Sequence, residues 1–147
     1  MRSQLARMID YIPSYEKGYV TKEDIVGACN ETKLYGYGVV YVLSNFYIPL
    51  AAKMLDGTES KVGAAVLHYF RAFEEHSTEV KAFMTRDAIE KGAKEVDMLM
   101  NIGAFKAGDY ESTRRDMESV VNIAKSMGEV IVKVILETGF LTDEEIV

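Results

Sequence analysis

The sequence contains few of the residues that build disulfides and metal sites. Its 147 residues include one cysteine and two histidines. A single cysteine, Cys29, excludes an internal disulfide and is typical of a reducing cytoplasm. Cys29 has no metal-ligand spacing to His68 or His76, and we expect it to be a small buried side chain on a helix. The sequence therefore predicts no metal site and no cofactor.

Long hydrophobic runs and an excess of positive charge are also absent. No stretch approaches the roughly 20 apolar residues that a membrane-spanning helix requires, and residues 1–10 lack the apolar core of a signal peptide. The formal net charge is −6, whereas nucleic acids and anionic membranes are bound mainly by clustered Lys and Arg. We expect no nucleic-acid partner, no membrane association and a cytoplasmic location.

What the sequence does have is a repeated alternation of strand and helix patterns. A first apolar segment ends at Asp10, and four later runs are typical of buried parallel strands, at residues 38–43, 61–67, 96–102 and 130–136. Helix starts near residues 21, 49, 78, 109 and 142 recur about every 30 residues, the length of a βα unit. The order predicts an α/β protein with a single domain over residues 1–147 and about five parallel strands.

Two finer expectations concern the segments that flank the fourth strand. The helix that starts near residue 78 is expected to turn Val80, Phe83, Met84 and Ala88 toward the core. Residues 103–108 are predicted to be a loop, because they are bounded by glycines.

Two charged residues interrupt the buried-strand patterns. Asp97 lies in the run 96–102 and Lys133 lies in the run 130–136. An unpaired carboxylate in a low-dielectric interior is costly, so Asp97 must either meet a cation or serve a water-filled site. If the two runs are neighbouring parallel strands, both side chains can point to the same interior. A structural ion pair and a chemically active pair at a barrel mouth are both open interpretations.

The alternation of strands and helices fits a doubly wound sheet and a (β/α)8 barrel. A nucleotide-binding doubly wound sheet carries a Gly-rich phosphate loop after its first strand, and this sequence has none. Charged residues within strands favour the barrel, because they can face its lumen. A complete barrel needs about 250 residues. We therefore predict a partial (β/α)8 TIM barrel with flanking helices.

Three segments carry a resemblance to a known family. Residues 88–104 read AIEKGAKEVDMLMNIGA, residues 106–111 read KAGDYE and residues 132–142 read VKVILETGFLT. These segments resemble the deoxyribose-phosphate aldolases, (β/α)8-barrel lyases of deoxyribonucleotide catabolism. The family reversibly cleaves 2-deoxy-D-ribose 5-phosphate to glyceraldehyde 3-phosphate and acetaldehyde through a lysine Schiff base. The resemblance implies a small phosphorylated sugar or aldehyde as the ligand.

The resemblance also implies roles for particular residues. Asp97 matches an aspartate that takes part in proton transfer, and Lys133 matches a lysine that supports substrate binding and charge balance in the same site. Both are therefore candidate catalytic residues. Asp10 and Asn101 are candidate substrate-binding residues.

The sequence departs from the family pattern in three places. Residues 11–14 replace the family's His-Thr-Leu-Leu, and residues 70–74 replace its Gly-Phe-Pro-x-Gly turn. The Schiff-base lysine of the family lies in a Lys-Thr-Ser-Thr-Gly motif on the sixth strand, which this sequence does not reach. We expect a C-terminally truncated relative that is inactive alone.

Two alternatives stay open at this point. Lys133 could itself form the Schiff base, since an apolar interior depresses the pKa of a lysine, although a nearby Asp97 would keep it charged. The chain could instead be a non-catalytic binding or oligomerising module, a homo-oligomer formed through the unpaired edges of a partial sheet.

Overall fold

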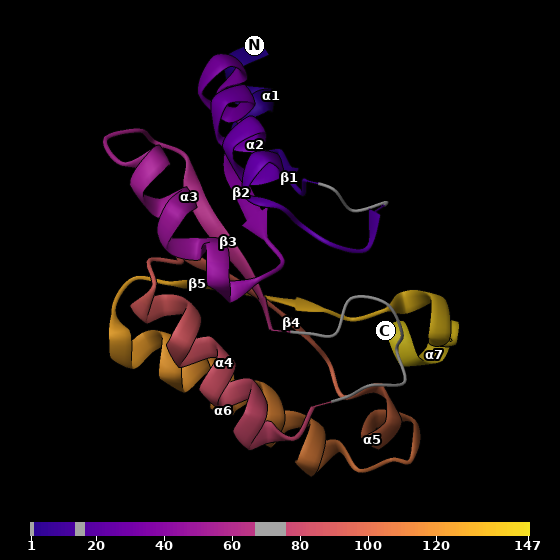
Figure 1. Cartoon of the computed structure of the whole chain (residues 1–147). Coiled ribbons are helices and arrows are strands. Elements are labelled where there is room, and N and C mark those ends of the chain that lie inside the picture. The colour runs from indigo at the N-terminus through magenta and orange to yellow at the C-terminus, as the bar shows by residue number, and fades with distance from the viewer. Residues whose placement is uncertain (1, 14–16, 67–75) are drawn as a thin grey trace.

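The five predicted parallel strands form one sheet. The computed structural model describes residues 2–13, 17–66 and 76–147. The strands are β1 (Asp10–Tyr11), β2 (Val39–Val42), β3 (Lys61–Val66), β4 (Glu95–Leu99) and β5 (Ile131–Ile135). All neighbours are parallel and the order is β1-β2-β3-β4-β5. Because each strand pairs with the next one along the chain, the sheet winds in one direction, as in a (β/α)8 barrel (Figure 1).

Helices connect the strands at the predicted places. They are α1 (Arg2–Ala6), α2 (Lys22–Tyr35), α3 (Ile48–Leu55), α4 (Thr78–Glu90), α5 (Ile102–Lys106), α6 (Tyr110–Met127) and α7 (Asp143–Ile146), with short 3-10 turns at Asn45–Tyr47 and Thr138–Phe140. The described residues contain no helix that is long and apolar enough to cross a membrane. The predicted partial (β/α)8 barrel with flanking helices is confirmed.

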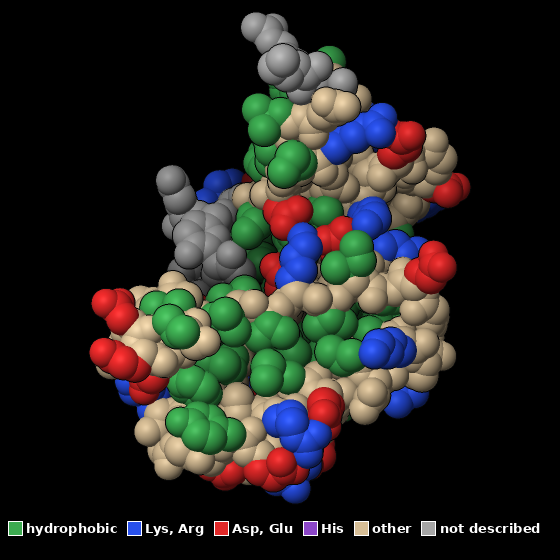
Figure 2. Space-filling model, turned by 180° about the vertical axis from the view of Figure 1, so that it is seen from behind, with side chains coloured by type: hydrophobic (Ala, Val, Ile, Leu, Met, Phe, Trp, Pro, Cys, Tyr) green, Lys and Arg blue, Asp and Glu red, His purple; other side chains and the backbone are tan. Residues whose placement is uncertain are grey.

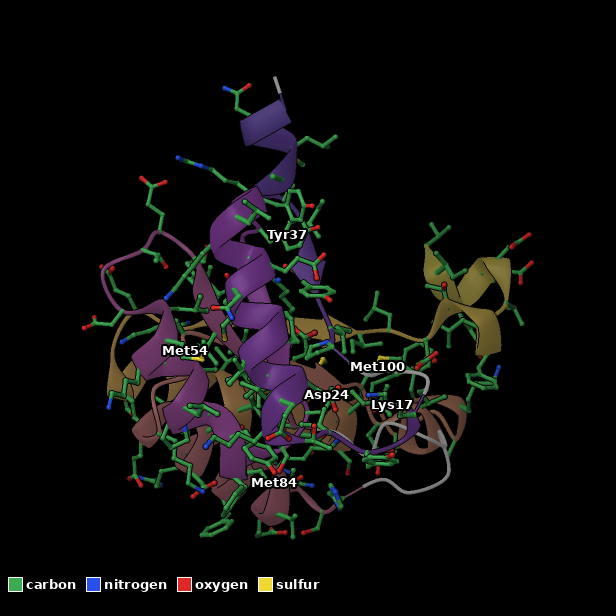
Figure 3. All side chains as sticks on the ribbon, turned by 45° about the horizontal axis from the view of Figure 1, so that its top comes forward. Lys17, Asp24, Tyr37, Met54, Met84 and Met100 are labelled. Carbon is green, nitrogen blue, oxygen red and sulfur yellow. The ribbon has the colours of Figure 1, made fainter. Side chains whose placement is uncertain are left out.

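The start of α2 shows how local sequence fixes a helix end. The Thr21 side chain accepts a hydrogen bond from the Asp24 amide, and the Asp24 carboxylate accepts one from the Thr21 amide, which together form a capping box. From the preceding loop, Lys17 donates a 2.8 Å hydrogen bond to Asp24, and the two side chains lie side by side (Figure 3). The acid in the first turn also complements the helix dipole.

Two boundaries differ from the sequence-based expectation. The first apolar segment was expected to be a strand ending at Asp10, but residues 2–6 are helical and Asp10 begins β1. The segment 103–108 is not simply a loop, because α5 occupies most of it. Asn101 caps α5 by accepting a 2.8 Å hydrogen bond from the Ala104 amide, so β4 ends at Leu99 and not at residue 102. The departure from the family pattern at residues 70–74 lies outside the described residues.

The core lies between one face of the sheet and the helices that cover it. Val40 and Val42 of β2, Val62 and Ala64 of β3 and Val96 of β4 are buried on this face. Helices α2, α3, α4 and α6 lie along it (Figure 1). The buried residues of α2 are Ile25, Ala28, Cys29 and Thr32, which confirms the expected buried position of Cys29 on a helix.

The buried face of α4 is only partly the predicted one, because Ala88 is buried and Met84 packs against the core as expected, but the other two residues do not. Val80 and Phe83 are 41% and 69% exposed, whereas Lys81 and Thr85 are buried together with Ala88. Lys81 Nζ lies 2.5 Å from Asp116 Oδ2 of α6 and donates a 3.1 Å hydrogen bond to the Leu99 carbonyl. The prediction failed for Val80 and Phe83 because a buried ion pair, invisible to an apolar pattern, rotates the helix.

Candidate functional site

The candidate site lies on the face of the sheet opposite α2, α3, α4 and α6, which we call the inner face. Side chains alternate along a strand, so Glu95 and Asp97 of β4 share this face, and the strand register places Asp97 directly beside Lys133 of β5. Tyr41 of β2 and Lys61 of β3 reach it as well. Viewed from behind, acidic and basic side chains gather near the middle of the molecule, next to a broad hydrophobic area (Figure 2).

Lys133 is the centre of an ionic network. Its Nζ lies 2.6 Å from Asp10 Oδ2 and 2.6 Å from Glu95 Oε2. Glu95 is only 4% exposed, and its other oxygen accepts a 2.9 Å hydrogen bond from Lys61 Nζ. The Lys133 ammonium is therefore held between two carboxylates, one from the strand beside it and one from the opposite edge of the sheet.

The contact between Lys133 and Asp10 also measures how far the sheet curves. β1 and β5 are its two edge strands, and neighbouring strands lie about 4.8 Å apart, which would separate the edges of a flat sheet by roughly 19 Å. A lysine and an aspartate side chain cannot span that gap. The 2.6 Å distance between Lys133 Nζ and Asp10 Oδ2 therefore requires a strongly curled sheet with a concave inner face.

Asp97 does not pair with Lys133, although the two are register partners. The Tyr41 hydroxyl donates a 2.6 Å hydrogen bond to Asp97 Oδ1, and the Tyr41 ring lies beneath Lys133, with Nζ 5.3 Å from the ring centroid. The sequence suggested a cation as the partner of Asp97. The structure gives it a neutral donor, and the expected cation pairs with Asp10 and Glu95.

These contacts shift the pKa values of the two carboxylates on β4 in opposite directions. Burial raises the pKa of Asp97, and the Tyr41 hydrogen bond and the Lys133 charge offset this only in part, so the pKa stays above its usual range. Burial also raises the pKa of Glu95, but hydrogen bonds from Lys133 and Lys61 outweigh it and bring the pKa below its usual range. Asp97 is thus the readier proton acceptor of the two near neutral pH.

Lys133 does not have the lowered pKa of a reactive amine. Burial lowers its pKa, but hydrogen bonds to Asp10 and Glu95 and the two negative charges outweigh burial, so the pKa lies above its usual range. Burial and the hydrogen bond to Asp97 also raise the pKa of Tyr41. At neutral pH the amine is therefore protonated, and the phenol is a hydrogen-bond donor.

The other candidate residues take different positions. Asp10 joins the network through Lys133. Asn101 follows the carboxyl end of β4, and its side-chain oxygen caps α5. No hydrogen bond among the described residues joins its side chain to the ionic network. Neither Tyr41 nor Glu95 was singled out from the sequence as a site residue. The available signals were the two-residue spacing from Glu95 to Asp97 and a glycine, Gly63, inside β3.

A cavity of about 720 Å³ opens at the amino ends of β2, β3 and β4. Arg7, Lys33 and Tyr37 line it, together with Lys61 and Glu95 from the ionic network. Asp97 is not part of its lining. Within the described ranges, no cluster of three or more His, Cys, Asp or Glu residues is arranged to hold a metal ion.

Comparison with known proteins relates this geometry to a family. The chain is 41% identical over 141 residues to the deoxyribose-phosphate aldolase of Thermoanaerobacter pseudethanolicus and 44% identical over 141 residues to that of Listeria monocytogenes. Each alignment covers 96% of this chain and 60% of the relative. By sequence and by fold, the chain is similar to the deoxyribose-phosphate aldolases. No protein-family model matches it.

Solved structures of deoxyribose-phosphate aldolases share the fold. A crystal structure from Coccidioides immitis, assigned to the same family, superposes with a TM-score of 0.86 at 32% identity and covers 99% of this chain and 54% of its own. The deoxyribose-phosphate aldolase of Aeropyrum pernix, described as a tetramer, has a TM-score of 0.78 at 22% identity, a likeness of fold alone. The chain thus spans about three fifths of the length of the curated aldolases it matches.

Proposed function

We propose that the inner face is the β1–β5 part of a deoxyribose-phosphate aldolase site. Asp97 would transfer protons, Lys133 would balance charge, and Asp10 and Asn101 would help to bind the substrate. The reaction would be reversible cleavage of 2-deoxy-D-ribose 5-phosphate to glyceraldehyde 3-phosphate and acetaldehyde. The curated relatives of that name, together with the two carboxylates of different ionisation on β4, support this proposal.

We also propose that residues 1–147 alone do not catalyse the reaction, because Lys133 does not form the Schiff base. The single observation that carries this proposal is the position of Lys133 Nζ, 2.6 Å from each of two carboxylates. A Schiff base forms from a neutral amine. An ammonium held by two carboxylates loses its proton less readily than an exposed lysine. Lys133 is therefore suited to orient or balance charge and unsuited to attack a carbonyl.

Borohydride trapping tests this proposal. The chain is incubated with acetaldehyde, or with glyceraldehyde 3-phosphate, then reduced and mapped by peptide mass spectrometry. We expect no reduced adduct at Lys133 above the level on exposed lysines. The double variant Asp10→Asn with Glu95→Gln removes both carboxylates and should increase labelling of Lys133. Glu111→Gln, which removes an exposed carboxylate beside Arg114 on α6, is the matched control. Selective labelling of Lys133 in the unaltered chain would refute the proposal.

A second candidate function is a non-catalytic assembly module. It is favoured by the edge of β5, which has only one strand neighbour in the described sheet. Ile131 in β5 is 44% exposed, and Leu136 and Phe140, which follow the strand, are 47% and 54% exposed. An unpaired strand with apolar side chains is a template for association.

Light scattering after size-exclusion chromatography tests the second candidate. Association through β5 predicts a mass above that of the monomer that falls toward it in Ile131→Lys, because a charge at a strand edge opposes pairing. Val80→Lys places the same charge at a similarly exposed aliphatic residue on α4 and should have no effect. A concentration-independent monomer would exclude this function.

A further inference from the structure

One residue of the inner face has no role in the family resemblance or in the proposed function, and that residue is Tyr41. Its side chain is only 1% exposed, although it lies on the inner face. It makes two specific contacts, a 2.6 Å hydrogen bond to Asp97 and a cation–π contact with Lys133. A side chain that only filled space would need neither contact.

The path of the Tyr41 side chain across the sheet depends on a glycine. Tyr41 is on β2 and Asp97 is on β4, so the ring must cross β3 to reach the carboxylate. The residue in register with Tyr41 on β3 is Gly63. A Cβ atom at Gly63 would lie 2.6 Å from Tyr41 Cε1, closer than two carbon atoms can pack. Gly63 therefore provides the space through which Tyr41 reaches Asp97.

Asp97 and Lys133 are register partners of opposite charge, and each has other hydrogen-bond partners. With the ring beneath Lys133 and the hydroxyl on Asp97 Oδ1, the aspartate is already satisfied by a neutral donor. Lys133 instead reaches Asp10 and Glu95. The second oxygen of Asp97, Oδ2, has no hydrogen-bond partner within the described ranges and is not among their buried unpaired atoms.

We propose that Tyr41 is the positioning residue of Asp97: its hydroxyl fixes Oδ1 and leaves Oδ2 to accept a hydrogen bond from a ligand hydroxyl. The ligand class is a small polyhydroxy compound or a hydrated aldehyde. The ligand part rests on the proposed function, whereas the positioning of Asp97 does not. An ion pair would lower the pKa of the aspartate and keep it ionised, whereas an aspartate that accepts a hydrogen bond from a phenol can still take up and release a proton.

Each of the five strands contributes a charged or titratable group near Asp97. These groups are Asp10 on β1, Tyr41 on β2, Lys61 on β3, Glu95 on β4 and Lys133 on β5. Of these, Tyr41 is the hydrogen-bond donor to Asp97, and this bond lowers the pKa of Asp97 against the effect of burial. Removing the hydroxyl must therefore shift the Asp97 titration to higher pH.

The test is a ¹³C NMR titration of the full chain labelled at aspartate carboxyls, with the Asp97 signal assigned by Asp97→Asn. Tyr41→Phe keeps the ring and removes the hydroxyl, and it should move the Asp97 midpoint to higher pH. Gly63→Ala keeps the hydroxyl and displaces the ring, and it should shift Asp97 in the same direction. Tyr11→Phe is the matched control, because its hydroxyl donates to Glu31 and not to Asp97. An Asp97 midpoint that is unchanged in both Tyr41→Phe and Gly63→Ala would overturn the proposal.

A second measurement separates the positioning role from the proposed function. Addition of 2-deoxyribose 5-phosphate should shift the Asp97 carboxyl signal in the unaltered chain, and the shift should be smaller in Tyr41→Phe. If the sugar phosphate changes no signal while Tyr41→Phe still moves the Asp97 midpoint, the proposed function fails and the positioning role stands. If the sugar phosphate shifts Asp97 equally in both proteins, Tyr41 does not prepare Asp97 for its ligand.

Discussion

Lys81→Met is expected to be among the most destabilising single substitutions in this chain. Lys81 and Asp116 are each 2% exposed, and their charged atoms lie 2.5 Å apart between α4 and α6. Lys81 also donates to the Leu99 carbonyl, and Thr78 donates to Asp116 at 2.9 Å. Removing the lysine leaves the Asp116 carboxylate buried with a single neutral donor, because water cannot reach it without opening the helix pair.

The magnitude follows from these contacts. Removal of one partner of a buried ion pair costs about 3–5 kcal/mol, and the unpaired Leu99 carbonyl adds about 1 kcal/mol. A loss of about 5 kcal/mol lowers the melting temperature of a chain of this size by roughly 10–20 °C. It is also a large share of the roughly 5–15 kcal/mol that holds a domain folded.

Urea unfolding followed by far-UV circular dichroism measures this loss, and a double-mutant cycle assigns its cause. Asp116→Leu together with Lys81→Met removes both charges and should recover at least half of the stability that Lys81→Met loses. Arg114→Ala removes an exposed cation from the same helix pair and should leave the urea midpoint nearly unchanged. If Lys81→Met behaves like Arg114→Ala, the contribution of the buried pair has been misjudged.

Three further predictions concern β4 and α2. The pKa of Glu95 is lowered in the folded state, so its ionised carboxylate stabilises the protein above its unfolded pKa, and this stability is lost as the pH falls through the folded pKa. Glu95→Gln should therefore lower the urea midpoint at about pH 7 and make the midpoint depend less on acid pH. The pKa of Asp97 is raised in the folded state, so its ionisation lowers the stability as the pH rises through the folded pKa. Asp97→Asn should therefore raise the urea midpoint at about pH 7. A lower urea midpoint in this variant would contradict the inferred cost of burying the carboxylate. Thr21→Ala removes the capping box of α2 and should cost about 1 kcal/mol in the same assay.

The sequence by itself determined the elements and their order. Capping residues such as Thr21 and Asp109, and glycines such as Gly36, fix helix ends through bonds within a few residues, and these ends could be predicted. The period of two in β4 and β5 also placed Asp97 and Lys133 on one face, because alternation is a property of each strand. Local rules were sufficient for these features.

Only the tertiary structure decided which groups meet. Lys133 pairs with Asp10, which is 123 residues away in sequence and at the opposite edge of the sheet, because the sheet curls. Tyr41 rather than Lys133 holds Asp97, because Gly63 on the strand between them leaves a path for the ring. The face of α4 that carries Lys81 is buried because Lys81 forms an ion pair with Asp116, which lies on α6. Each of these contacts joins residues far apart along the chain, so the partner of a charged side chain was set by the curvature and register of the whole sheet and by the packing of its helices.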